Sequence, residues 1–266
     1  MSSKHFEFIT YEVKDRICYI GLNRPKARNA MNTKMLREFA HALTAYEDEA
    51  EARCAVIFAH GKAFTLGLEL DDVAQTMRSG KGMLPEGAID PWEAGNGANR
   101  LRTKPTVVAV HGFCLTLGIE FLLASDVRIA APSSRFGQVE VQRGIMPFGG
   151  ATFRFVQTAG WGNAMRYMLT GDDFNAEEAL RIGLIQEVVE KDRLMERATE
   201  LATRIADQAP LAVQATIASS RKAQLEGVEA CKNELLPVTL RLMDTEDAAE
   251  GVQSFIEKRK ANYKGK

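Results

Sequence analysis

Residues 107–126 read V-V-A-V-H-G-F-C-L-T-L-G-I-E-F-L-L-A-S-D, and this stretch decides the fold. An apolar strand at its start runs into a glycine-containing turn and then into an apolar helix that begins near Leu117. The first turn of such a helix carries backbone N–H groups without intrahelical partners, and it lies at the positive end of the helix dipole. The stretch therefore predicts a helix N-terminus that is suited to an anion or a developing oxyanion.

The alternation of strands and helices extends along most of the chain. A helix is predicted from Asn32 or Thr33, either of which can cap it, because apolar residues then recur at helical spacing. Short apolar stretches typical of strands occur at residues 6–13, 17–22, 54–59, 106–110 and 127–130. Strands that alternate with helices predict an α/β architecture with buried strands.

The last quarter of the chain has a different character. Beyond about Lys191 the pattern is nearly all helical. Apolar residues repeat there at Leu194, Ala198, Leu201 and Ile205. We therefore divide the chain into an α/β core at residues 1–190 and a C-terminal helical region at residues 191–266. Helices that follow an α/β body often pack against a partner subunit, so we expect this region to serve oligomerisation.

Composition excludes several classes of partner. The 266-residue chain has a formal net charge of −1, so no global basic field attracts nucleic acid or an anionic membrane. The four cysteines form no C-x-x-C pair and no Cys/His cluster at metal-ligand spacing, so we expect buried thiols in a reducing compartment and no metal site. Because the sequence has neither a signal-peptide pattern nor an apolar run of about 20 residues, we expect a cytoplasmic protein.

Two carboxylates lie in apolar surroundings. Glu120 falls in the first turn of the apolar helix, where it either compensates the helix dipole or acts as a partly buried general acid or base. Glu140 lies in R-F-G-Q-V-E-V-Q-R-G-I-M-P-F-G-G at residues 135–150, where it either pairs with Arg143 at the surface or faces the first carboxylate. Two carboxylates in one apolar pocket push their pKa values apart, so one holds a proton while the other accepts one.

Two further stretches allow two interpretations each. In G-K-A-F-T-L-G-L-E-L-D-D at residues 61–72, Gly67 permits a tight turn that either points the amide of Leu68 into a cleft or simply follows a strand. Residues 76–99 are rich in glycine and proline without a clear period, so they form either a lid over a ligand or a solvated excursion.

Together and in this order, these stretches resemble the crotonase superfamily, the enoyl-CoA hydratase/isomerase family. G-K-A-F-T-L-G-L-E-L is similar to the family's first oxyanion segment, A-F-x-A-G-A-D-[LI], and H-G-F-C-L-T-L-G-I-E to the second, N-G-x-[AC]-x-G-G-G-x-E. The resemblance implies that the amides of Leu68 and Leu117 donate to a thioester oxygen. It places Glu120 on one catalytic glutamate, and F-G-Q-V-E, which resembles F-G-x-P-E, places Glu140 on the second.

The resemblance also implies an acyl-CoA site. R-P-K-A-R-N-A-M-N at residues 24–32 is similar to the family's N-terminal signature, whose loop contacts the CoA nucleotide. The implied contacts are Lys26, Ala27, Arg28, Ala30, Ala63, Glu69, Leu70, Asp71, Phe255 and Lys258, with Arg259 as a further candidate. The C-terminal residues among them would reach a neighbouring subunit's site. Arg28 stays open between a phosphate contact and an ordinary surface charge.

The family pattern implies a crotonase-like spiral of ββα units with outer helices, assembled as a homotrimer or a dimer of trimers. Coenzyme A is part of the substrate, and no other cofactor is implied. The chain departs from the pattern where Thr116-Leu117-Gly118 replaces three glycines and where Leu68-Glu69 replaces alanine and aspartate. A leucine still supplies its backbone N–H, but its side chain must change the acyl pocket or the local backbone.

The predicted activity is syn hydration of a trans-2-enoyl-CoA to a 3-hydroxyacyl-CoA. Enoyl-CoA isomerisation is the nearest alternative, and the presence of both glutamates favours hydration. A serine peptidase with a related spiral fold is disfavoured because no serine occupies a G-x-S-x-G turn. A non-catalytic relative that binds acyl-CoA or RNA is a further alternative, for which the net charge gives no support on the RNA side.

Overall fold

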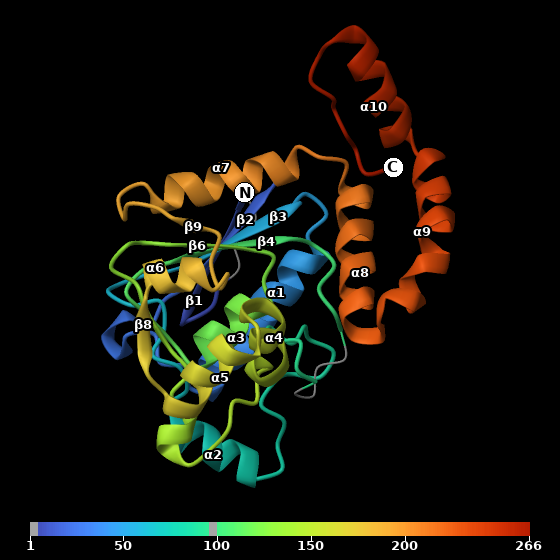
Figure 1. Cartoon of the computed structure of the whole chain (residues 1–266). Coiled ribbons are helices and arrows are strands. Elements are labelled where there is room, and N and C mark those ends of the chain that lie inside the picture. The colour runs from blue at the N-terminus through green and yellow to red at the C-terminus, as the bar shows by residue number, and fades with distance from the viewer. Residues whose placement is uncertain (1–4, 96–99) are drawn as a thin grey trace.

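The computed structural model describes residues 5–95 and 100–266 (Figure 1). Its main sheet has six strands in the order β1-β2-β3-β4-β6-β9. The first pair is antiparallel and the remaining pairs are parallel. The strands are β1 (Ile9–Lys14), β2 (Ile17–Leu22), β3 (Cys54–Ala59), β4 (Thr106–Val110), β6 (Val127–Ala130) and β9 (Glu187–Val188).

Helices cover both faces of this sheet, so side chains alternate between two cores. Val107 and Ala109 of β4 pack beneath α7 (Leu194–Ala206). Val108 and Val110 face the larger core on the opposite side, with α1 (Thr33–Asp48) and α3 (Leu117–Leu123). This period-2 alternation of apolar residues explains why the central strands read as continuous apolar runs.

A second, smaller sheet lies beside α3. Its strands are β5 (Phe113–Leu115), β7 (Arg135–Gly137) and β8 (Asp173–Asn175), in that order. The helices that follow β7 along the chain are the 3₁₀ helix η2 (Glu140–Arg143), α4 (Ala151–Ala159), α5 (Trp161–Thr170) and α6 (Ala176–Arg181). Because β5 leads directly into α3, the small sheet fixes where that helix begins.

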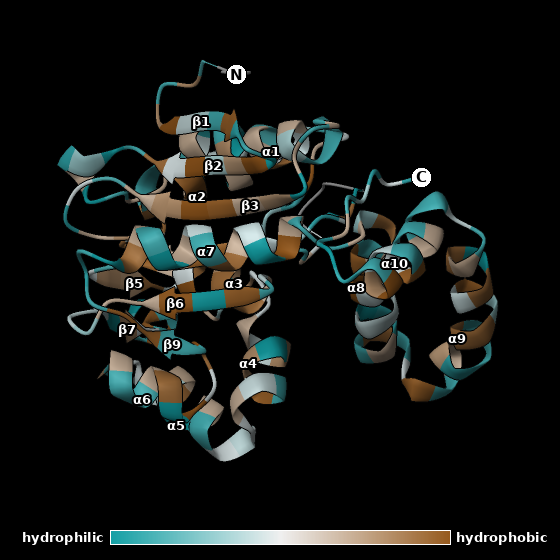
Figure 2. Cartoon of the chain, turned by 90° about the horizontal axis from the view of Figure 1, so that it is seen from above, coloured by the Kyte–Doolittle hydropathy of each residue, from teal (hydrophilic) through white to brown (hydrophobic). Residues whose placement is uncertain are grey.

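The chain leaves this body after α7 and forms an arm of three helices (Figures 1 and 2). They are α8 (Pro210–Glu226), α9 (Val228–Met243) and α10 (Glu246–Glu257). The predicted α/β class with a helical C-terminal region is confirmed. Helix α7 belongs to the predicted C-terminal region but packs on the main sheet, and the boundary between residues 190 and 191 stays a prediction. None of the described helices is both long and apolar enough to cross a membrane.

Several predicted bounds change in the structure. The first strand begins at Ile9 instead of residue 6, while the next four predicted strands have the predicted bounds. Helix α2 (Leu70–Arg78) extends into residues 76–99, which were predicted to be irregular throughout. Past this helix the segment is not simply a solvated excursion, because it places apolar side chains in the larger core; these are Leu84, Ala88, Ile89 and Trp92. The last part of the segment, residues 96–99, lies outside the described residues.

One asparagine attaches the loop at residues 24–32 to the body. Asn29 is fully buried, and its side-chain oxygen accepts a hydrogen bond from the backbone N–H of Arg24 at 2.7 Å. Its amide nitrogen donates to the carbonyl oxygens of His60 at 2.9 Å and Ala63 at 2.8 Å. The residue therefore connects the N-terminal loop to the segment that follows β3.

We expect Asn29→Ala to lower the free energy of unfolding by about 3 kcal/mol, because one buried and two partly buried backbone groups lose their partner. The matched control is Asn32→Ala, which removes one bond, the helix cap from the Met35 N–H, and should cost about 1 kcal/mol. Chemical denaturation of both variants measures the difference. Equal losses in the two variants would contradict the role assigned to Asn29.

Candidate active site

The two amides predicted to bind an oxyanion follow segments that run side by side. Thr65 forms a parallel bridge with Cys114 of β5, and two backbone hydrogen bonds flank the bridge. The same offset places Gly67 opposite Thr116, and the next residues of the two segments are Leu68 and Leu117. A Cβ atom on Gly67 would meet the Thr116 hydroxyl oxygen at 1.9 Å, and Gly67 also has a φ of +89°. Only glycine allows this approach, which brings the two segments together.

The backbone before α3 is strained. Thr116 has φ 50° and ψ −114°, a conformation that β-branched residues rarely adopt. Its hydroxyl oxygen is buried and has no hydrogen-bond partner among the described residues. Strain of this kind is concentrated at functional sites, where the surrounding structure holds it in place. Thr116 occupies the position of the first of the three glycines in the family pattern.

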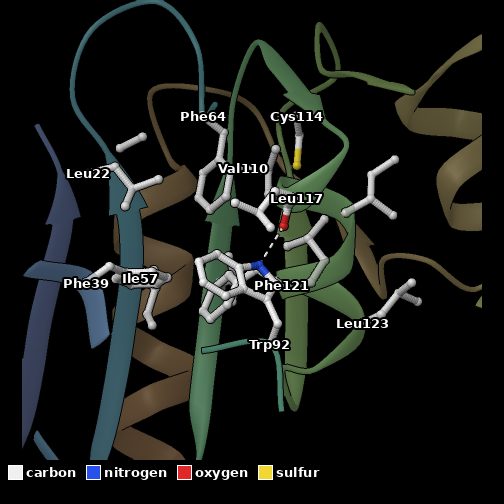
Figure 3. Packing of buried hydrophobic residues seen from close by; sticks show 14 of the residues in the cluster. Leu22, Phe39, Ile57, Phe64, Trp92, Val110, Cys114, Leu117, Phe121 and Leu123 are labelled. Atoms are coloured by element: carbon white, nitrogen blue, oxygen red, sulfur yellow. Dashed lines mark hydrogen bonds between the residues drawn. The ribbon is translucent and has the colours of Figure 1, made fainter. Parts of the chain in front are cut away.

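Both leucines turn their side chains toward the protein interior. Leu117 is buried in the larger core beside Phe64, Val110 and Phe121 (Figure 3), and Leu68 packs against the same core. Their backbone N–H groups have no acceptor in residues 5–95 and 100–266. Both amides therefore lack an acceptor among the described residues, as the donors of an oxyanion hole would.

Glu120 lies one turn into α3 and is 2% exposed. One of its carboxylate oxygens accepts hydrogen bonds from the backbone N–H of Gly149 at 2.8 Å and of Ala151 at 3.1 Å. A Cβ on Gly149 would come within 2.6 Å of the other oxygen, so the absence of a side chain there makes room for the carboxylate. Burial raises the pKa of Glu120 to about 7, although the two amides and nearby Arg154 oppose the shift.

Glu140 begins the η2 helix and is 7% exposed. Its Oε1 accepts a hydrogen bond from the Gln138 amide at 3.0 Å, while its Oε2 is buried without a partner among the described residues. Burial raises the pKa of Glu140 to about 7, a backbone hydrogen bond opposes the shift, and the charge of Glu120 adds to it. A negative charge on Glu120 therefore favours the protonated form of Glu140.

The geometry disagrees with purely structural roles for the two carboxylates, namely compensation of the helix dipole by Glu120 and a surface ion pair between Glu140 and Arg143. Glu120 is too buried to be only an exposed compensation of the helix dipole. Glu140 forms no ion pair with Arg143 in the part of the chain that the structure describes, where the Arg143 guanidinium donates to the carbonyl of Gln142. Two buried carboxyl groups whose pKa values are both raised toward neutrality are suited to general acid/base chemistry.

The residues predicted to contact CoA from the N-terminal half occupy two adjacent segments. Lys26 and Arg28 are exposed on the η1 helix (Pro25–Ala27) and at its end, while Ala27 and Ala30 are partly buried. Ala63 is buried in the next segment, and Glu69, Leu70 and Asp71 are exposed at the start of α2. The segments are joined where the Arg24 guanidinium pairs with Glu69 at 2.6 Å and the Met31 N–H donates to the Gly67 carbonyl at 2.8 Å.

The C-terminal candidates lie elsewhere. Phe255 is 85% exposed on α10, Lys258 follows the helix, and Arg259 pairs with Glu250. Figure 1 shows α10 at the far end of the arm, away from α3. The structure therefore does not bring these three residues to the glutamates of their own chain, and a contact with another subunit's site stays a prediction.

Sequence reasoning missed the residues that hold the two carboxylates. Gln138 lies only two residues before Glu140, but Val139 between them has φ −99° and ψ 13°, so no strand alternation marked the contact. The amides of Gly149 and Ala151 carried no signal either, since a backbone donor 29 or 31 residues away has no side chain to mark it. Trp92, whose indole nitrogen lies 2.9 Å from the Leu117 carbonyl oxygen, was equally hidden.

Comparison with known proteins agrees with this geometry. The chain is 31% identical over 253 residues to a 2,3-dehydroadipyl-CoA hydratase of Escherichia coli, covering 95% of this chain and 97% of the relative. It is 32% identical to a crotonyl-CoA hydratase of Syntrophomonas wolfei over 97% of this chain and 98% of that one.

Solved structures confirm the predicted crotonase-like fold. The crystal structure of a probable enoyl-CoA hydratase/isomerase from Mycobacterium abscessus superposes with a TM-score of 0.95 at 46% identity, covering 98% of this chain and all of the other. The family model for enoyl-CoA hydratase/isomerase matches residues 12–266. With this match over nearly its whole length, the chain belongs to the enoyl-CoA hydratase/isomerase family.

Proposed function

We propose that the protein is an enoyl-CoA hydratase that adds water to a trans-2-enoyl-CoA and yields a 3-hydroxyacyl-CoA. The observation that carries the proposal is the pair of buried glutamates, each with its pKa raised to about 7, next to two backbone amides without acceptors. The hydratase names of the relatives from E. coli and S. wolfei support the same reaction class.

The local environments favour a division of labour between the carboxyl groups. Two backbone donors stabilise the charged form of Glu120, whereas the negative charge of Glu120 disfavours ionisation of Glu140. Glu120 therefore takes a proton from water as the water oxygen bonds to the β carbon. Glu140 gives its proton to the α carbon. The proton gained by Glu120 and the one lost by Glu140 are then exchanged to restore the starting state.

The two amides act on the charge that forms between these proton transfers. When water adds to the β carbon, electrons move onto the thioester oxygen, and the N–H groups of Leu68 and Leu117 would donate to it. A donor of this kind contributes about 2.7–4 kcal/mol in the transition state, because it is already oriented and excluded from water. Since neither donor depends on a side chain, the replacement of glycine by leucine at position 117 leaves this chemistry possible.

Isomerisation of an enoyl-CoA is the alternative that the site also permits. A double-bond shift needs one proton removed and one returned, which a single carboxyl group can perform. The burial of both Glu120 and Glu140 favours hydration over this alternative. Coenzyme A enters as part of the substrate, with the exposed Lys26 and Arg28 as the proposed contacts to its phosphates.

The arm supports a proposal of homo-oligomerisation, as a trimer or a dimer of trimers. Helices α9 and α10 expose apolar side chains on the single chain, and brown stretches of ribbon mark the hydrophobic residues of these helices in Figure 2. The exposed residues include Leu235, Leu236, Leu240, Met243, Phe255 and Ile256. A contiguous apolar face of this kind on a soluble protein marks an interaction site. We propose that it meets another copy and carries Phe255 and Lys258 toward the neighbour's CoA.

Replacing either glutamate should abolish most hydration. We expect Glu120→Gln and Glu140→Gln each to lower kcat about 10²- to 10⁴-fold while acyl-CoA still binds, because each removes one proton-transfer group. Loss of the conjugated-thioester absorbance of a series of trans-2-enoyl-CoAs measures the reaction. Glu196→Gln, on the exposed surface of α7, is the control and should retain full activity. Near-normal turnover in either glutamate variant would refute the two-carboxylate mechanism.

The rate of hydration should depend on pH with a bell-shaped profile centred near 7. Below the range, protonation of Glu120 removes the base; above it, ionisation of Glu140 removes the acid, since the pKa of each is raised to about 7. The two midpoints belong to the coupled pair and not to single residues. A profile of kcat/KM that stays flat from pH 5 to 9 would contradict this assignment.

The raised pKa of Glu140 should also make the stability of the folded protein depend on pH. Because the folded-state pKa of Glu140 is raised to about 7, its contribution to stability is fully present below the unfolded-state pKa and is lost as pH rises through 7. Glu140→Gln removes this dependence. Its melting temperature relative to that of the parent should therefore be higher at pH 8 than at pH 5, by an amount worth at most about 3 kcal/mol. A constant difference across this range would show that Glu140 titrates normally.

A further inference from the structure

The first turn of α3 is held by a tryptophan from a distant part of the chain. The indole N–H of Trp92 donates to the carbonyl oxygen of Leu117 at 2.9 Å, as the dashed line in Figure 3 shows. Trp92 is 2% exposed and packs in the same core as Leu117 and Phe121. The bond is the most direct link between the irregular segment at residues 79–95 and the proposed oxyanion hole.

The hydrogen bond from Trp92 acts on the residue that carries one of the two proposed oxyanion donors. Leu117 carries both the carbonyl that accepts from Trp92 and the N–H proposed to donate to the thioester, so the indole restrains the same residue in the first turn of α3. The residue before it, Thr116, has a strained backbone with φ 50° and ψ −114°. A strained entry into a helix relaxes unless the surrounding structure holds it, and the indole supplies a constraint on the interior side.

Trp92 is itself fixed by several bonds. The Asp90 carboxylate accepts from the backbone N–H of Trp92 at 2.8 Å and of Ala94 at 2.9 Å. The Arg154 guanidinium donates to the carbonyl oxygens of Trp92 at 2.7 Å and Glu93 at 2.9 Å. The ring of Phe39 packs against the indole edge at 6.2 Å between centroids. The indole is thus held at the backbone on both sides and at the ring.

We propose that Trp92 is a positioning residue for hydration, which keeps the Leu117 amide aligned with the thioester oxygen by holding the Leu117 carbonyl. This proposal rests on the proposed hydratase function. Residues 90–94 would then support the proposed oxyanion hole. A lid, in contrast, would have to move. Because the alignment matters most where negative charge is greatest, the bond should act on kcat more than on KM.

The test compares two variants that each delete one aromatic donor to a buried carbonyl. Trp92→Phe removes the indole N–H and keeps a ring in the core. Tyr46→Phe is the matched control, because the Tyr46 hydroxyl donates to the Pro105 carbonyl at 2.7 Å in the same core, on a different element. We expect Trp92→Phe to lower kcat about 10-fold with KM changed less than 2-fold, and Tyr46→Phe to leave both constants unchanged, although both lower the melting temperature.

A spectroscopic measurement separates alignment from general loosening. In a Glu140→Gln background, a bound trans-2-enoyl-CoA should remain unhydrated, so the infrared stretch of its thioester carbonyl reports the hydrogen bonds it accepts. We expect the shift to lower wavenumber on binding to shrink when Trp92→Phe is added and to persist with Tyr46→Phe. If Trp92→Phe fails to fold, Asp90→Asn, which disturbs the bonds that orient the Trp92 backbone, should give a smaller change in the same direction.

The outcomes distinguish the two proposals. Absence of hydration by the parent protein on every enoyl-CoA would overturn the proposed function, whatever the variants do. Hydration by the parent together with an unchanged kcat and an unchanged carbonyl shift in Trp92→Phe would overturn the positioning role alone. Equal losses of kcat in Trp92→Phe and Tyr46→Phe would also overturn it, because the effect would then follow from core stability.

Discussion

The parallel bridge between Thr65 and Cys114 is the constraint on which the proposed chemistry depends. Two segments that follow different strands of the main sheet are locked in one register there, and their next turns come into contact at Gly67 and Thr116. A shift of register by one residue would move the amides apart and reverse the side chains. The two proposed donors, the amides of Leu68 and Leu117, follow this contact directly and need no polar side chain, which leaves room for sequence variation at positions 68 and 117.

The proposed acid/base chemistry depends on the desolvation of Glu120 and Glu140. Both lie in apolar surroundings that raise their pKa values to about 7. Two backbone amides oppose the shift at Glu120, and a backbone hydrogen bond opposes it at Glu140, where the Gln138 side-chain amide also donates. Each carboxyl group can therefore lose or gain a proton near neutral pH, as a reaction that removes one proton and delivers another requires.

Local patterns in the sequence were sufficient to predict most of the central strands and the start of α3. The strand-turn-helix sequence of residues 107–126 predicted where α3 begins, and the apolar runs at β2, β3, β4 and β6 predicted those strands with their observed bounds. Contacts between distant segments were not predictable, because single residues such as Trp92 and Gly149 show no periodicity and each contact has a backbone group as one partner. The segment around residues 79–95 looked irregular for the same reason, since its turns follow the core they fill instead of a repeating pattern.

The arm has a consequence for how the molecule responds to dilution. On the single chain, the outer helices present leucines and aromatic side chains to water, and an interface between copies would remove that surface from solvent. The folded state would then be stabilised by mass action, with a melting temperature that rises with total protein. Expression level, and not sequence alone, would in that case set how much of the chain persists in its working form.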